Sequence, residues 1–139
     1  MVQTEDINFL QELPEVEFNE LVVIPLLMSM GYENIRYTHG VLEQGKDVIF
    51  TKNDPIAGIK HLAATIKSKP LKGSVSDSKS IREVYFQVSQ ALKQPYLNPF
   101  DGQDTYINEV YVITPFPIGQ NAVLSIKGEL TDHSNRVNF

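Results

Sequence analysis

The stretch KDVIFTKNDPIAGIKHLAATIKSK, residues 46–69, decides the fold because its pattern is that of two strands joined by a tight turn. In its first part Val48 and Phe50 alternate with other residues, and a period of two is typical of a strand with one face buried. The Asn, Asp and Pro at 53–55 favour a turn. Residues 61–69 then predict a second strand, buried at Leu62, Ala64 and Ile66 or on both faces near Ala63, so an antiparallel hairpin is expected.

Periodicity on either side of this hairpin predicts the other elements of the fold. They are a helix over residues 17–30 interrupted at Pro25, a short strand ending near Gly40, a helix over 80–93, a strand within 107–116, a helix over 121–130 and the start of a strand at 136–139. The helix at 80–93 carries a capping-box pattern, Ser80 followed by Glu83. The order predicts an α/β protein: a three-layer sandwich with a central mixed β-sheet flanked by helices.

Length and composition indicate one domain, residues 1–139, in an ordinary folded protein. The longest apolar stretch, residues 21–30, is too short to cross a membrane, and the N-terminus carries acids where a secretory signal carries basic residues. We therefore expect a cytoplasmic protein that does not use a membrane. The last strand stops at residue 139, which predicts an N-terminal piece of a longer protein with additional C-terminal domains.

The net charge of −5 conceals a segregation along the chain. No basic residue precedes Arg36, whereas residues 52–82 hold seven Lys or Arg against two Asp. A basic segment can bind a polyanion or can simply be a solvated face. Lys69, Lys72 and Lys79 are the candidate nucleic-acid contacts.

The absence of cysteine excludes disulfides, thiolate zinc sites and cysteine nucleophiles. His39, His61 and His133 lack a second histidine at ligand spacing, so a structural role is favoured. No nucleophile elbow and no phosphate-binding glycine loop are present. Any metal must therefore be held mainly by oxygen.

Oxygen ligands and a lysine could meet at one end of the hairpin. Asp47 begins the first strand, Thr65 and Lys67 share a face of the second, and Glu20 lies on the first helix. Mg²⁺ needs few carboxylate oxygens besides water and phosphate, and a nearby lysine could orient water and stabilise developing charge. Each residue also has a plainer interpretation: a helix-dipole acid for Glu20, turn chemistry for Asp47 and an edge charge for Lys67.

Several segments in this order carry a family resemblance: FNELV at 18–22, MGYENI at 30–35, GKDVI at 45–49, AATIK at 63–67, Gly73 with Ser74, Gln87, and EVYVIT at 109–114. Together they resemble the Mrr-type branch of the PD-(D/E)xK restriction-endonuclease-like superfamily, across about residues 18–130. The resemblance implies the αβββαβ order and a metal-dependent DNA endonuclease, an effector in a bacterial antiviral defence or restriction protein, that uses Mg²⁺ or Mn²⁺.

Carried over by position, the resemblance implies that Asp47 is a metal ligand, Lys67 the catalytic lysine, Glu20 an assisting ligand and Gln87 an auxiliary group. A surface glutamine on a helix is the plain alternative for Gln87. The departure is Thr65, which stands where the family has Glu or Gln and offers only a weak hydroxyl ligand. Enzymatic activity is therefore open.

Two alternatives remain beside the nuclease hypothesis. The first is a catalytically degenerate nuclease-like module that binds nucleic acid or docks a protein partner, and the second is an unrelated structural α/β domain. The oligomeric state is also open, with a homo-oligomer as one alternative.

Overall fold

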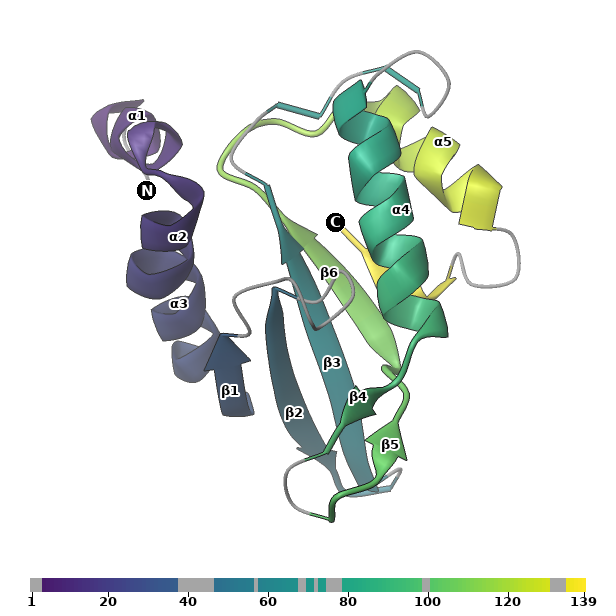
Figure 1. Ribbon diagram of the computed structural model, residues 1–139. Helices are drawn as coiled ribbons and strands as arrows, with labels where there is room; N and C mark the ends of the chain where they lie inside the picture. Colours follow the sequence, from purple (N-terminus) through teal and green to yellow (C-terminus); the bar gives the residue numbers. More distant parts are fainter. Residues whose placement is uncertain are drawn as a thin grey trace.

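The computed structural model describes residues 4–37, 47–56, 58–67, 70–71, 73–74, 79–98, 101–130 and 135–139. At its centre is a mixed five-stranded sheet with the order β1-β2-β3-β6-β7 (Figure 1). The strands are β1 (Glu33–Tyr37), β2 (Val48–Asp54), β3 (Gly58–Ile66), β6 (Glu109–Ile113) and β7 (Val137–Asn138). The protein is thus α/β with a mixed sheet, as the sequence predicts.

The predicted hairpin is confirmed and forms the middle of the sheet. β2 and β3 pair antiparallel, with Val48 opposite Ala64 and Asp54 opposite Gly58. β1 also pairs antiparallel with β2, whereas β6 lies parallel to β3 and β7 parallel to β6. β3 begins and ends three residues earlier than predicted, because the positive φ of Gly58 (82°) lets pairing start directly after the turn.

Helices cover both faces of the sheet, an arrangement compatible with the predicted three-layer sandwich (Figure 1). On one face α4 (Lys79–Lys93) and α5 (Gln120–Leu130) pack over a core that includes Ile49, Ala63 and Val112. On the other face the N-terminal helices pack over a core that includes Phe50 and Ala64. Successive residues of a strand point to opposite faces, so alternate residues of one strand contact the same helical layer.

The N-terminal layer is a chain of short helical pieces. They are α1 (Thr4–Glu12), α2 (Glu15–Phe18), the π-helix η1 (Asn19–Val23) and α3 (Ile24–Ser29). The Ile24 N–H donates to the carbonyl of Asn19, five residues back, and Pro25, which has no N–H to donate, stands at the start of α3. The predicted interruption at Pro25 is confirmed, whereas α1 was not predicted.

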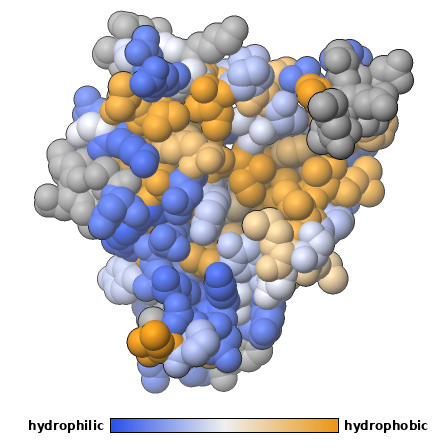
Figure 2. Space-filling model, turned by 180° about the vertical axis from the view of Figure 1, so that it is seen from behind, coloured by the Kyte–Doolittle hydropathy of each residue, from blue (hydrophilic) through white to orange (hydrophobic). Residues whose placement is uncertain are grey.

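The N-terminal layer leaves apolar side chains exposed. They are Ile7, Phe9, Leu21, Leu26 and Met28, followed by Met30 after α3. Seen from behind, hydrophobic side chains gather in a broad area of the surface (Figure 2). A pocket of about 290 Å³ opens between α3 and the end of β6, with Leu26, Met30, Tyr111 and Phe139 among its walls. This layer therefore covers its face of the sheet incompletely.

The α4 layer is more regular. The inward side of α4 is a fully buried row of Ile81, Val84, Val88 and Ala91. The helix begins at Lys79, one residue before the predicted cap. After it a small ribbon of β4 (Tyr96–Leu97) and β5 (Asp104–Thr105) forms where the sequence predicts only a polar loop, because two-residue strands carry no periodic signal.

Candidate active site

Three of the predicted site residues lie on the face of the sheet that α4 covers. Ile49 and Ala63 belong to the core beneath α4. Alternate residues of a strand share a face, so Asp47 lies on the same face as Ile49. Thr65 and Lys67 likewise lie on the same face as Ala63. Asp47 directly precedes β2, and Lys67 directly follows β3. The antiparallel register brings these two strand ends together.

Asp47 is fixed against the end of β3 by two hydrogen bonds. Its backbone N–H donates to the carbonyl of Ala64 over 3.0 Å, and its Oδ2 accepts from the N–H of Ile66 over 2.8 Å. Burial raises the pKa of Asp47, while the Ile66 N–H and the Lys67 ammonium act to lower it. The carboxylate is thus held one residue from Lys67 in a place where its negative charge is only partly compensated.

Lys67 forms an ion pair with α4. Its Nζ lies 3.6 Å from Oε2 of Glu83, with the lysine side chain 16% exposed and the glutamate side chain 50% exposed. Its backbone N–H also donates to the carbonyl of Ile113, which ties the end of β3 to β6. The ammonium therefore has a defined position between the sheet and α4.

Glu83 is the residue that sequence reasoning missed. The capping-box pattern assigned it to the start of the helix, and no local signal distinguishes a capping glutamate from one that faces a lysine 16 positions earlier. The signal that could have found it is the apolar stripe of α4, because that stripe fixes which flank of the helix meets the end of β3.

Gln87 follows Glu83 by one helical turn, so both residues lie on the same side of α4. Within the part of the chain that the structure describes, its Oε1 is buried and accepts no hydrogen bond. A buried carbonyl oxygen without a donor costs free energy, and a bound ligand or ordered water can supply the missing partner. The side-chain oxygen of Gln87 is therefore not at the surface of the helix.

Thr65 is fully buried, at 0% exposure, and stands opposite Val112 of β6 in the register. A longer side chain at this position would have to fit into the packed space beneath α4. Thr65 thus offers no carboxylate from β3, whereas Glu83 brings one from α4 to Lys67.

Glu20 lies apart from this group, and Lys79 is the basic candidate that belongs to the described residues. Glu20 is exposed on η1, whose neighbours Phe18 and Val23 pack against the opposite face of the sheet. Lys79 is exposed at the start of α4. Lys69 and Lys72 lie outside the described residues, as do His39 and His133.

His61 stands at the other end of β3 and has a structural environment. Its Nδ1 lies 2.5 Å from the Tyr96 hydroxyl, and its backbone N–H donates to Oδ1 of Asn108. Burial lowers the pKa of His61. These contacts fasten the β4–β5 ribbon and the start of β6 to β3.

The donor set suits a hard cation. Asp47, Glu83 and the Oε1 of Gln87 offer oxygen atoms only, and Mg²⁺ binds through one or two carboxylates and keeps several waters. Among the described residues there is no cluster of three or more His, Cys, Asp or Glu side chains able to hold a metal ion. A metal at this place would rely on few protein ligands.

No family model, curated protein sequence or solved structure matches this chain. Among the residues that the structure covers, no helix combines the length and apolar character that membrane crossing requires.

Proposed function

We propose that this chain is a metal-dependent endonuclease domain that hydrolyses phosphodiester bonds of DNA. One observation carries the proposal: the Asp47 carboxylate is bonded to the Ile66 N–H, next to Lys67, and the Lys67 ammonium lies 3.6 Å from a second carboxylate, Glu83. Carboxylates can hold a hard cation, and a lysine can stabilise the negative charge that develops on a phosphoryl group.

The topology supports the same proposal. A three-stranded antiparallel meander is followed by α4 and by β6, which pairs in parallel with β3 (Figure 1). The resemblance to the restriction-endonuclease-like superfamily implies an αβββαβ order, and a mixed sheet with helices on both faces is compatible with it. That resemblance also extends the proposal to an effector role in a bacterial defence or restriction protein.

Asp47 and Glu83 are the proposed carboxylate ligands for Mg²⁺ or Mn²⁺, with Gln87 Oε1 as a neutral oxygen beside them. The hydrogen bond from the Ile66 N–H holds the Asp47 carboxylate at the end of β3. When bound, the cation would polarise the phosphoryl group and lower the pKa of a coordinated water. Gln87 can accept a hydrogen bond from such a water, which would satisfy its buried oxygen.

The proposed role of Lys67 is to interact with the phosphate group. Its ammonium is a compact charge that can orient the attacking water and stabilise negative charge building on the phosphoryl oxygens. Glu83 holds this ammonium before substrate arrives, so less ordering is left for the reaction itself. Glu83 thereby has two roles, cation ligand and positioning residue for Lys67.

A nuclease-like module without catalysis is the second candidate function. The observation that favours it is the full burial of Thr65, which places a hydroxyl where the family pattern has a carboxylate or amide. The exposed position of Glu20 in the opposite layer points the same way. In this case the domain would bind nucleic acid or a protein partner without cleaving DNA.

The test is cleavage of plasmid DNA in the presence of Mg²⁺ or Mn²⁺. We expect nicking by the wild-type chain and a loss of at least about a hundredfold in Asp47→Asn, Glu83→Gln and Lys67→Met, since each removes charge from the reacting centre. Glu12→Gln is the matched control, because Glu12 is exposed on α1 and should have no effect.

The variant Glu20→Gln tests whether Glu83 or Glu20 is the second carboxylate ligand beside Asp47. Activity close to wild type supports Glu83 as the ligand, whereas a hundredfold loss would restore the role that the resemblance implies for Glu20. Absence of cleavage with both metals, together with DNA binding that persists in EDTA, would reject catalysis and favour the degenerate module.

A further inference from the structure

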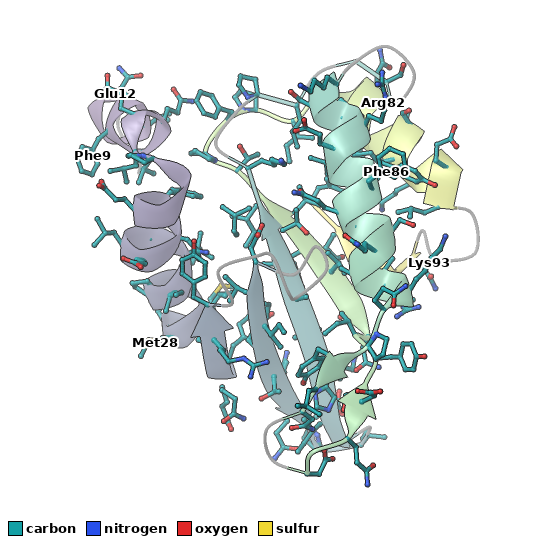
Figure 3. The ribbon with its side chains drawn as sticks, viewed as in Figure 1. Phe9, Glu12, Met28, Arg82, Phe86 and Lys93 are labelled. Carbon is teal, nitrogen blue, oxygen red and sulfur yellow. The ribbon has the colours of Figure 1, made fainter. Side chains whose placement is uncertain are left out.

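The outward side of α4 carries an alternation of cations and an aromatic ring. Lys79, Arg82, Phe86 and Lys93 are separated by three, four and seven residues, a spacing that puts them on one face of a helix. All four are exposed, and we call them the outer stripe. The labelled members follow α4 along its length (Figure 3). The stripe faces away from the buried row of Ile81 and Val84.

The charge of the outer stripe is opposite to that of the chain. α4 contains three cations and one acid, Glu83, and the ion pair with Lys67 engages that acid. The whole chain has a net charge of −5. A positive row on an acidic protein is complementary to a polyanion and sets the place where one would bind.

Phe86 gives the stripe a second property. Its side chain is 60% exposed, although a phenylalanine side chain gains free energy from burial. The neighbouring Tyr85 ring lies at a centroid distance of 5.4 Å and an interplanar angle of 52°, which limits the positions open to Phe86. The stripe thus presents a supported aromatic face between Arg82 and Lys93.

We infer that the outer stripe binds single-stranded DNA, with Phe86 stacking on an unpaired base and the three cations contacting phosphates. Sequence-independent binding of single strands combines these two elements, a positive track and an aromatic platform. A duplex keeps its bases stacked on one another and offers none to Phe86. From Lys79 to Lys93 the helix rises about 21 Å, which matches about six nucleotides at 3.4 Å each.

The inference goes beyond the proposed function, because the stripe needs neither a metal nor Asp47. Binding is therefore measured in EDTA, where metal-dependent hydrolysis cannot occur. The binding inference and the proposed nuclease function can thus fail independently of each other. The probe is a fluorescent oligothymidylate of about twelve nucleotides, twice the span of the stripe. The readout is fluorescence anisotropy over a range of salt concentrations.

We expect Phe86→Ala to weaken binding about tenfold, the scale of one lost stacking contact. The matched control is Phe9→Ala, because Phe9 is 62% exposed on α1, with Glu12 rather than a cation one turn away. The control should bind as the wild type does. Circular dichroism of each variant verifies the fold.

The salt dependence tests the cations. Three phosphate contacts predict a slope of log K against log salt of about −2, and Lys93→Gln should reduce its magnitude by about 0.7. Lys52→Gln is the control, since Lys52 is exposed and lies over Tyr32 on the other face of the sheet. A change in slope with Lys93→Gln alone supports the stripe.

Three outcomes would overturn the inference. One is absence of oligonucleotide binding at low salt, and another is equal effects of Phe86→Ala and Phe9→Ala. The third is binding of anionic lipid vesicles without binding of the oligonucleotide, which would assign the stripe to a membrane surface instead.

Discussion

The two helical layers of this protein differ in charge and in regularity. The N-terminal layer contains six acids and no basic residue over residues 4–29, is divided into four helical pieces and exposes Phe9, Leu21 and Met28. The α4 helix is one regular segment of 15 residues with three cations and a fully buried inner row. Figure 3 shows labelled members of both layers on opposite sides of the molecule.

This difference separates two tasks. The α4 layer has a well-packed inner face, and from its polar flank Glu83 pairs with Lys67 at the end of β3. A rigid helix holds such groups more accurately than a segmented one. The N-terminal layer instead covers part of the sheet and keeps apolar side chains at the surface. We therefore assign the proposed chemistry to the α4 layer.

The largest expected effect is a loss of unfolding free energy when a buried side chain of α4 is shortened. Ile81→Ala removes a fully buried side chain of α4 and should lower the free energy of unfolding by about 3 kcal/mol. Leu21→Ala in the N-terminal layer should change it by less than about 0.5 kcal/mol, because Leu21 is 63% exposed. Urea unfolding measures both. A large loss of unfolding free energy in Leu21→Ala would show that the exposed side of the N-terminal layer is covered in solution. The two layers would then be packed alike.

The stability of the protein should depend on pH through Tyr111, which lines the pocket beside the N-terminal layer. Burial and a hydrogen bond with Tyr32 raise the pKa of Tyr111 to about 12 from an ordinary value of 10. The native state thus favours the neutral phenol. Its contribution to stability is complete below pH 10 and is lost as the pH rises through 10 to 12.

Tyr111→Phe should therefore reduce the fall in unfolding free energy over that interval, measured by denaturant titration at several pH values. The matched control is Tyr106→Phe, because Tyr106 is 60% exposed. If both variants lose stability with pH as the wild type does, the environment of Tyr111 is not the source of the dependence.

The smallest effect should be the contribution of the Lys67–Glu83 ion pair to stability. Glu83 is half exposed, and exposed pairs contribute about 0.2–1 kcal/mol. A double-mutant cycle with Lys67→Met and Glu83→Gln measures the coupling free energy. A coupling above about 2 kcal/mol would make the pair a structural element, and the activity loss predicted for Glu83→Gln would then lose its catalytic meaning.

The sequence predicts the central sheet well because its signals are local. Alternation at Val48 and Phe50 and the turn at 53–55 are properties of adjacent residues, and the hairpin follows from them. The inner row of α4 is equally local, since it repeats within one helix. Elements without such repetition, namely α1 and the β4–β5 ribbon, were not predicted.

The candidate site could be predicted only in part. The hairpin register places Asp47 against Ile66, the residue before Lys67, so this proximity is contained in the strand pattern. Glu83 meets Lys67 only through the packing of α4 on the sheet, which no short pattern encodes. The resemblance implied Glu20 as an assisting ligand from the first helix, but η1 and α3 pack against the other face of the sheet.

The parallel pairing of β3 with β6 has a consequence for folding. Leu62 stands opposite Glu109, 47 residues later, whereas Val48 stands opposite Ala64 across a short turn. Hairpins form within microseconds, while contacts between distant residues must first overcome the entropy of closing a long loop. Asp47 and Lys67 should thus come together early, and Glu83 should join them only when α4 docks. In a chain emerging from the ribosome, the hairpin would then form before α4 adds Glu83 to the proposed catalytic group.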